Sequence, residues 1–297
     1  MSSISEAQSV ISPAEMTNRA KNYGYKKVIK SSSQSFMLAI AAGMFIALAF
    51  VFYVTVTTGS TGPWGLVHLV GGLVFSMGLI LVVLCGTELF TSTVLSLISR
   101  ANNEVSTGAM LRCWIRVYFG NMVGSLFIVL LIMGAGVYAA DHGLWGLNVL
   151  HLAEHKIHHT FLQAFTLGIM CNMMVCLGVW LTFCSDNPLT KAILMILPVA
   201  MFVASGFEHC VANMFMIPMG IAIHYFADAS FWNAIGMAPS DFSDLTIHNF
   251  IINNLIPVTL GNIVGGAVII GLGFWSIFRP SIQAHSSQGS KVVESGH

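Results

Sequence analysis

The fold of this chain is decided by one stretch, Ser205-Gly206-Phe207-Glu208-His209-Cys210-Val211-Ala212-Asn213-Met214. It places Glu208 and His209 inside an apolar segment that runs from residue 192 to about residue 226. One helix of about 35 residues would be roughly 52 Å long, whereas the hydrocarbon core of a bilayer is about 30 Å thick. We therefore predict that the helix breaks near Ser205-Gly206. Ionisable residues at membrane depth are costly and usually mark a pathway or a relay.

The composition indicates an all-α polytopic membrane protein. Of the 297 residues, 56% are hydrophobic and only 8% are charged, and the mean hydropathy is +0.80. This charge content is too low for a soluble globular domain. The zero net charge gives no indication of a nucleic-acid partner. No cysteine belongs to a Cys-x-x-Cys pair, so we expect six small buried side chains without disulfide, metal or cofactor: Cys85, Cys113, Cys171, Cys176, Cys184 and Cys210.

The apolar segments predict six transmembrane spans. Two of them are too long for one straight crossing, and we expect both to break at the midplane. The approximate spans are 36–56, 66–98, 108–139, 161–183, 191–226 and 249–278. Eleven of the twelve Lys and Arg residues fall on one side of this arrangement, and Lys156 is the exception. The excess of positive charge places both termini in the cytoplasm.

The spans divide the chain into five parts. Residues 1–35 form a cytoplasmic segment, and the pattern from Pro13 predicts an amphipathic helix on the membrane surface. The alternative is a disordered tail that ends in basic residues. Because the segment is basic, we also hypothesise that it gates a pore at low pH. The remaining parts are a first three-span repeat at 36–140, a periplasmic loop at 141–160, a second repeat at 161–278 and a cytoplasmic tail at 279–297.

Three short matches recur in the same order in the two halves. They pair Phe36-x-x-Ala39-x-x-x-Gly43 with Phe161-x-x-Ala164-x-x-x-Gly168, Gly86-x-Glu88 with Gly206-x-Glu208, and Gly120-Asn121-x-Val123-Gly124 with Gly261-Asn262-x-Val264-Gly265. Each unit holds three spans, so the second copy is upside down relative to the first. This predicts inverted repeats, in which paired broken helices mark the binding site.

The inverted arrangement directs two half-helix N-termini at the bilayer centre, one near Thr91 and one near Glu208. Each carries roughly +0.5 of a charge and attracts small anions. We expect the hydroxyls of Thr91-Ser92-Thr93 to cap the first end, and Glu208 to lie in the first turn of the second helix. The residues alone therefore predict a pathway for small anions or neutral molecules.

Five motifs resemble the formate/nitrite transporter family, most closely its formate channels. They are Gly86-x-Glu88-Leu89-Phe90-Thr91-Ser92-Thr93, Tyr118-Phe119-Gly120-Asn121, Trp145-Gly146-Leu147-Asn148, His155-Lys156-x-His158-His159-Thr160-Phe161 and Ser205-Gly206-Phe207-Glu208-His209-x-x-Ala212-Asn213-Met214. The resemblance implies a homopentamer of aquaporin-like protomers in a bacterial inner membrane, without catalysis. Each protomer would pass formate and similar small monovalent anions, among them nitrite and acetate, in a pH-dependent way.

The resemblance also implies roles for individual residues. His209 corresponds to a central histidine that protonates or hydrogen-bonds the permeating anion, and Thr91 faces it. Lys156 would attract anions in the outer vestibule. Polar neighbours would orient His209: Asn172, Glu208, Asn213 and Asn262. Two constrictions would flank the centre, one of Phe75 and Phe202 and one of Leu79, Leu89, Phe90 and Val175. Cys210 stands where the family often has serine, and Glu88 where some formate channels have aspartate.

Several alternatives stay open at this level. Thr91 can be only a helix cap, and Lys156 only a solvated loop residue. The cluster of His155, His158 and His159 lacks nearby cysteine or acidic ligands, so we expect vestibule histidines and no metal site. Nitrite or hydrosulfide transport on the same fold is the nearest rival function. A water channel is a second rival, although the chain lacks two Asn-Pro-Ala motifs, and no nucleophile–base pair supports an enzyme.

Overall fold

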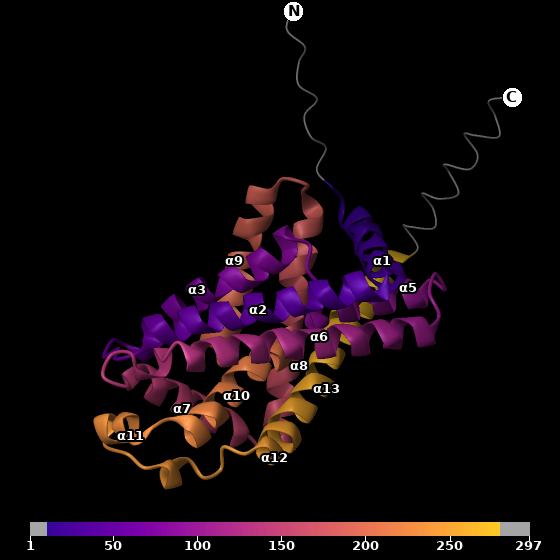
Figure 1. The fold of residues 1–297 in the computed structure, drawn as a ribbon. Helices are drawn as coiled ribbons and strands as arrows, with labels where there is room; N and C mark the ends of the chain where they lie inside the picture. Colours follow the sequence, from indigo (N-terminus) through magenta and orange to yellow (C-terminus); the bar gives the residue numbers. More distant parts are fainter. Residues whose placement is uncertain (1–10, 280–297) are drawn as a thin grey trace, which may run out of the picture.

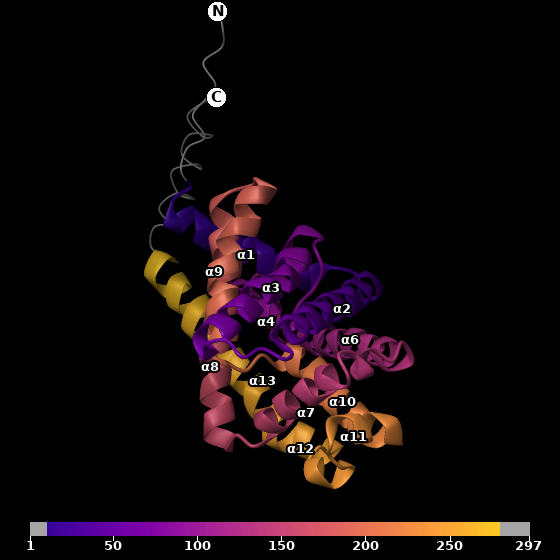
Figure 2. The same ribbon diagram turned by 90° about the vertical axis from the view of Figure 1, so that its left-hand side faces the viewer.

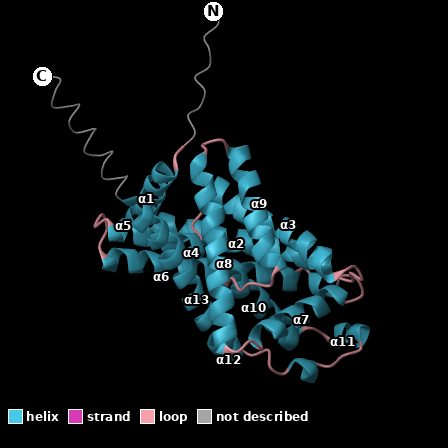
Figure 3. Ribbon diagram, turned by 180° about the vertical axis from the view of Figure 1, so that it is seen from behind, coloured by secondary structure: helices cyan, strands magenta, loops and turns pink. Residues whose placement is uncertain are grey.

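The computed structural model describes residues 11–279, and over this range every regular element is a helix (Figure 1). The long helices α2 (Ser32–Thr57) and α6 (Thr107–Gly134) lie side by side along the length of the molecule. Figure 3 shows the same helices from behind, joined by loops.

Five helices are long and apolar enough to cross a membrane. They are Ser32–Thr57, Trp64–Leu84, Thr107–Gly134, Phe161–Cys184 and Pro239–Arg279. A bent pair, α10 (Cys210–Phe226) with α11 (Ala229–Ile235), turns by 108° and raises the number to six if it counts as one span. The shorter apolar helix α9 (Pro188–Ala204) precedes α10. The chain is therefore an all-α, multi-pass membrane protein, as its composition indicates.

Both expected helix breaks are present. Helix α3 (Trp64–Leu84) ends before Gly86, which has φ +68°, and the chain resumes with the short elements α4 (Phe90–Thr93), η1 (Val94–Ser96) and α5 (Leu97–Ala101). Helix α9 ends before Gly206, which has φ +70°, and α10 follows. Glycine adopts this left-handed conformation without the cost that a Cβ would impose. The prediction that spans 2 and 5 are broken is confirmed.

Glycines let the helices of each half approach closely. A Cβ on Gly124 of α6 would overlap the Ile40 carbonyl of α2, and a Cβ on Gly265 would overlap the Ile169 carbonyl of α8 (Phe161–Leu181). Small residues at such crossings are typical of membrane helix packing. The last span contains α12 (Ile247–Asn249), the π-helix η5 (Phe250–Leu255), α13 (Ile256–Ile263) and the π-helix η6 (Val264–Leu272).

These contacts correct the alignment of the first and fourth spans. The sequence match pairs Phe36 with Phe161, whereas a Cβ on Gly120 would meet the Phe36 carbonyl and one on Gly261 would meet the Phe165 carbonyl. The equivalent positions are therefore one helical turn further along the fourth span. Glycine and alanine recur at helical spacing on both faces of such spans, so a short motif can match out of register.

The segments between the spans contain more helix than expected. The 141–160 segment, which we expected to be a polar loop, contains α7 (Leu144–Ile157) with the buried residues Trp145, Val149 and Leu150. The 227–246 segment holds α11 and η4 (Pro239–Phe242). The apolar residues of α7 have the spacing of an amphipathic helix. The histidines in and around this segment made it look like a polar loop in the sequence. In Figure 2, α7, α11 and α12 lie at the end of the molecule opposite α1.

The N-terminal helix α1 (Pro13–Ile29) packs on the protein. Its buried face includes Ala20 and Gly24, and Arg19 pairs with Asp186 at 2.9 Å. The Tyr23 hydroxyl donates to Ser92 Oγ at 3.0 Å, beside the first helix break. The helix therefore contacts protein on the face that we expected to lie on the membrane. Residues 1–10 and the tail 280–297 lie outside the described residues.

Candidate functional site

The two helix breaks meet at Thr91 and His209. Thr91 Oγ1 and His209 Nε2 are 2.9 Å apart, and both side chains are buried. His209 is also the N-cap of α10, because its Nδ1 accepts the Ala212 N–H at 3.0 Å. A ring nitrogen that accepts a hydrogen bond carries no proton, so the proton of a neutral ring is on Nε2 and points at Thr91. Thr91 then accepts this bond and keeps its own hydroxyl proton available as a donor.

Buried asparagines satisfy the backbone at both breaks. Asn121 of α6 donates to the Glu88 carbonyl at 2.9 Å, and its Oδ1 accepts the Phe90 N–H at 2.8 Å. The second half repeats this pattern. Asn262 donates to the Glu208 carbonyl at 2.9 Å, and its Oδ1 accepts the Cys210 N–H at 2.9 Å. Non-helical backbone at membrane depth requires such internal partners. Each broken helix is therefore capped by the following span of its own half.

This arrangement contradicts two expectations about local capping. The hydroxyls of Ser92 and Thr93 donate to the Leu89 carbonyl at 3.1 and 2.8 Å, so they do not cap the N-terminus of α4. Hydroxyls inside a helix commonly bond the preceding turn in this way. Glu208 lies one residue before the N-cap of α10 and not in its first turn. The first N–H group after each break is bonded by a distant asparagine, which local sequence spacing does not reveal, and His209 adds a local cap to α10.

Asn172 of α8 connects the two breaks. Its Nδ2 donates to the Thr91 carbonyl at 3.0 Å and to the Asn262 carbonyl at 2.6 Å. Cys176, one turn further along α8, also donates to the Thr91 carbonyl, at 3.3 Å. Asn172 thus positions Thr91. In the described structure, none of the four polar neighbours hydrogen-bonds the His209 ring itself, whose partners are Thr91 and Ala212.

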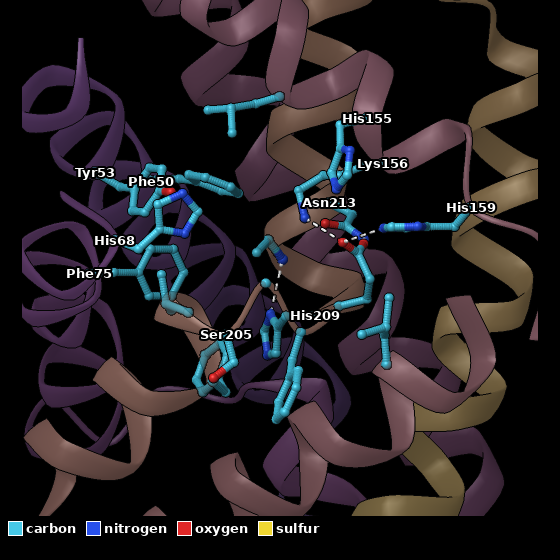
Figure 4. Close-up of a pocket in the computed structure, with 18 of the residues that line it drawn as sticks. Phe50, Tyr53, His68, Phe75, His155, Lys156, His159, Ser205, His209 and Asn213 are labelled. Carbon is cyan, nitrogen blue, oxygen red and sulfur yellow. Dashed lines mark hydrogen bonds and ion pairs between the residues drawn. The ribbon is translucent and has the colours of Figure 1, made fainter. Parts of the chain in front are cut away.

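A buried ion pair lies beside the second break. Lys156 Nζ is 2.8 Å from Glu208 Oε1, and the Glu208 side chain is only 2% exposed. Glu208 Oε2 accepts from Asn213 Nδ2 at 2.6 Å and from Asn254 Nδ2 at 3.1 Å. Figure 4 shows Lys156, Asn213 and His159 around this carboxylate. Asn254 was missed from the sequence, because an asparagine in the last span carries no local motif.

The first break has a similar ion pair that the sequence analysis also missed. Lys30 Nζ lies 2.8 Å from Glu88 Oε1, and the Ser35 hydroxyl bonds the other carboxylate oxygen. Lys30 was grouped with the basic N-terminal segment, where nothing distinguishes it from the other lysines. A pocket of about 150 Å³ at this end is lined by Lys30 and by Gly86 and Thr87 of the break.

The larger cavity opens at the Lys156 end and has a volume of about 370 Å³. Its lining brings together six predicted residues, namely Phe75, Lys156, Phe202, Glu208, His209 and Asn213. Figure 4 labels four of them: Phe75, Lys156, His209 and Asn213. The rings of Phe75 and Phe202 meet edge to face at 6.1 Å, and Phe202 stacks on the His209 ring at 6.0 Å. We call this space the Lys156 cavity.

Phe90 lies apart from the other predicted constriction residues. Its ring packs against Tyr118 at 4.9 Å and Trp114 at 6.4 Å, and it lines a surface groove between α6 and α13. Three other predicted constriction residues are buried in the helix core: Leu79, Leu89 and Val175.

Histidines surround the mouth of the Lys156 cavity. His155 and His159 line it, with their rings 4.9 Å apart, whereas His158 pairs with Asp244 at 3.1 Å. Burial lowers the pKa of His159, and the nearby Glu208 carboxylate opposes this shift. We therefore expect His159 to be neutral at neutral pH, and the lysine that lines this cavity is Lys156.

The chain was compared with known families and proteins. The family model described as formate/nitrite transporter matches residues 14–276. The formate channel FocA of Escherichia coli strain K12 is 54% identical over 267 residues, which are 90% of this chain and 94% of the relative. FocA of Haemophilus influenzae is 54% identical over 88% of this chain and 93% of the relative.

Solved structures agree with this assignment. A pentameric formate channel with formate bound has a TM-score of 0.80 and 53% identity, and the match covers 83% of this chain and 97% of that one. An FNT family ion channel has a TM-score of 0.75 and 26% identity, covering 89% and 98%. The matched residues include both helix breaks and the capping asparagines, and the chain belongs to the formate/nitrite transporter family.

Proposed function

We propose that this protein is a channel for formate and similar small monovalent anions. Its relatives at 54% identity are named formate channels, and the similar solved structure is described as pentameric with formate bound. In this proposal the chain forms a homopentamer in a bacterial inner membrane, with both termini in the cytoplasm. The bias of Lys and Arg supports that orientation, and the Lys156 cavity then faces the periplasm.

The contact between Thr91 and His209 carries the proposal. The two side chains come from opposite helix breaks and lie where the N-termini of α4 and α10 approach each other. Both helix ends favour negative charge. A small carboxylate that inserted at this contact would accept one hydrogen bond from the Thr91 hydroxyl and one from the His209 Nε2–H. Two fixed donors in a buried place suit an anion with two adjacent oxygens.

The path to this contact passes the Lys156 cavity and the ring pair of Phe75 and Phe202. Lys156 raises the local concentration of anions in the cavity. The two rings touch, so a permeant must displace them, and one or two carbons require the smallest displacement. A packed aromatic pair therefore selects small anions by size. The Phe90 ring packs against Tyr118 of α6, and the proposed constriction of Leu79, Leu89, Phe90 and Val175 lies on the other side of the Thr91–His209 contact.

The hydrogen bonds of His209 define how a proton can move. A neutral ring with Nε2–H donates a hydrogen bond, but loss of that proton would leave an imidazolate, which is too basic to form here. At acid pH a proton from water can bind Nδ1, which breaks the bond from the Ala212 N–H and gives an imidazolium. The imidazolium can pass its Nε2 proton to a formate oxygen. The products are formic acid and a neutral imidazole, and the acid crosses the apolar path uncharged.

This proton step predicts a pH dependence of transport. The pKa of an unperturbed histidine is about 6.5, and that of a carboxyl resembling formate is about 3.5. Near neutral pH the channel passes the hydrogen-bonded anion and carries current. As the pH falls, a growing share crosses as formic acid. His209 therefore decides which species permeates.

The test is formate flux into liposomes between pH 4 and 8, for the wild type and His209→Phe. We expect the variant to carry a pH-independent anion current, whereas wild-type uptake becomes electroneutral in acid. Identical profiles at every pH would show that His209 has no role in proton transfer. Parallel fluxes of nitrite, hydrosulfide and water compare the rival substrates, and conduction of water alone would exclude the proposed function.

A further inference from the structure

We propose that Asn254 is a positioning residue that orients the Lys156–Glu208 ion pair toward the Lys156 cavity. The Asn254 side chain is fully buried. Its Nδ2 donates to the Lys156 carbonyl at 3.0 Å and to Glu208 Oε2 at 3.1 Å. Its Oδ1 accepts from Asn213 Nδ2 at 2.7 Å. One amide therefore contacts three elements of the site. The transport readout of this inference depends on the proposed function, but the labelling readout described below does not.

The position of Asn254 depends on an unusual helical turn. It lies in the π-helix η5, between α12 and α13, and Pro257 follows in α13. A π-turn holds one more residue than an α-turn, and such turns are frequent at functional sites. The wider turn places Asn254 against the end of α7 and against the loop that precedes α10. A regular α-helix over the same residues would rotate this side chain relative to Pro257.

The two carboxylate oxygens of Glu208 have separate partners. Oε2 accepts from the amides of Asn213 and Asn254, whereas Oε1 faces Lys156 at 2.8 Å and, further away at 3.8 Å, His159 Nε2. A buried carboxylate needs such donors, because burial of an unpaired charge is costly. With Oε2 held by two amides, the carboxylate cannot rotate to share both oxygens with Lys156. The ammonium therefore has one counter-ion contact, and its other two N–H groups remain for anions in the cavity.

Asn254 also fixes the backbone that carries Lys156. The amide bonds the Lys156 carbonyl in the last turn of α7, so backbone and counter-ion are held by the same group. The Lys156 side chain is only 12% exposed. The Lys30 pair differs, since in the described structure the Glu88 carboxylate contacts Ser35 and Lys30 and no side-chain amide. Asn254 thus gives the Lys156 end a restraint that the Lys30 end lacks.

Asn254→Ala tests this inference, and Asn253→Ala is the matched control. Asn253 lies in the same π-turn, and its Nδ2 donates only to Asn249 Oδ1 among the described residues. Both variants therefore change a residue of the same turn, but only Asn254→Ala removes the bonds to the ion pair. A membrane-impermeant amine reagent is applied to purified protein, and peptide mass spectrometry measures the rate of modification of Lys156. Asn254→Ser, which keeps one hydroxyl donor, replaces Asn254→Ala if that variant does not assemble.

We expect Asn254→Ala to increase the rate of Lys156 modification at least about fivefold, since it removes a hydrogen bond to a buried charge. Asn253→Ala should leave the rate unchanged, and Asn254→Ser should be intermediate. Equal rates in Asn254→Ala and Asn253→Ala would overturn the proposal.

Transport provides a second, independent readout. Asn254→Ala should raise the KM for formate added at the Lys156 side and leave the maximal rate nearly unchanged. In a Lys156→Ala background the same substitution should have no further effect, because the two residues act together. Additive effects on KM would mean that Asn254 only supports the fold, and would also overturn the proposal. If the wild type conducts no formate, the proposed function fails, while the labelling comparison still decides the role of Asn254.

Discussion

Replacing Asn262 by Ala removes the cap of the second broken helix. The side chain is fully buried, and it bonds the Cys210 N–H at 2.9 Å, the Glu208 carbonyl at 2.9 Å and the Gly168 carbonyl at 2.8 Å. The Cys210 N–H and the Glu208 carbonyl would lose their partner where water cannot replace it, whereas the Gly168 carbonyl lies inside α8 and keeps its helical bond. The two unsatisfied groups flank His209, so the loss acts directly on the proposed centre.

The magnitude follows from these two groups. A side-chain hydrogen bond between membrane helices averages about 0.6 kcal/mol, whereas an unsatisfied buried group costs about 1–3 kcal/mol. The two backbone groups left without a partner should therefore lower the free energy of unfolding by about 2 to 6 kcal/mol. Thr259→Val is the control, because Thr259 lies on the same helix and loses one bond, to Tyr118 at 3.0 Å. We expect that control to cost less than about 1 kcal/mol.

The assay is equilibrium unfolding in mixed micelles, followed by tryptophan fluorescence, together with formate flux. We expect Asn262→Ala to be the less stable variant and to lose the pH dependence of flux, because the His209 backbone is no longer held. Asn262→Asp keeps the acceptor for the Cys210 N–H and loses both donors, so it should not restore stability. If Asn262→Ala is as stable as Thr259→Val, the capping argument is wrong.

Two further predictions concern other parts of the fold. Gly206→Ala should lower the free energy of unfolding by about 1–2 kcal/mol, because φ is +70°; a Cβ there meets no atom within 4 Å, so no steric overlap adds to this cost. Gly124→Ala should cost more, since its Cβ overlaps a backbone carbonyl. Equal unfolding free energies of the two variants would contradict this order. The hydrogen bonds from Ser230 and from the α11 backbone lower the pKa of Asp228. The stabilisation of α11 by this cap is therefore fully present above the ordinary carboxyl pKa, and it is lost as the pH falls through the lowered pKa. The protection factor of the α11 amides, which corrects for the intrinsic exchange rate at each pH, should therefore fall in acid in the wild type and be low at every pH in Asp228→Ala.

Much of the architecture was predictable from sequence because each feature has a local cause. The apolar spans follow from composition, and the breaks at Gly86 and Gly206 follow from excess length and from residues that tolerate left-handed backbone. The pairing of Thr91 with His209 followed from two half-helices that point at one centre, together with the family resemblance. The register of the first repeat match was wrong, because small residues recur at several turns of the same helix.

Other features depend on where distant segments meet. The roles of Lys30 and Asn254 arise from contacts with Glu88 and Glu208, which lie 58 and 46 residues away in the sequence. The tautomer of His209 depends on its bond from the Ala212 N–H, which exists only because α10 begins there. The sequence by itself determined a membrane protein with two broken helices, since hydropathy and helix length are local properties. Only the tertiary structure decided which amides cap the breaks and which lysines neutralise the buried glutamates, because a buried polar group is satisfied by whichever side chain the packing brings to it.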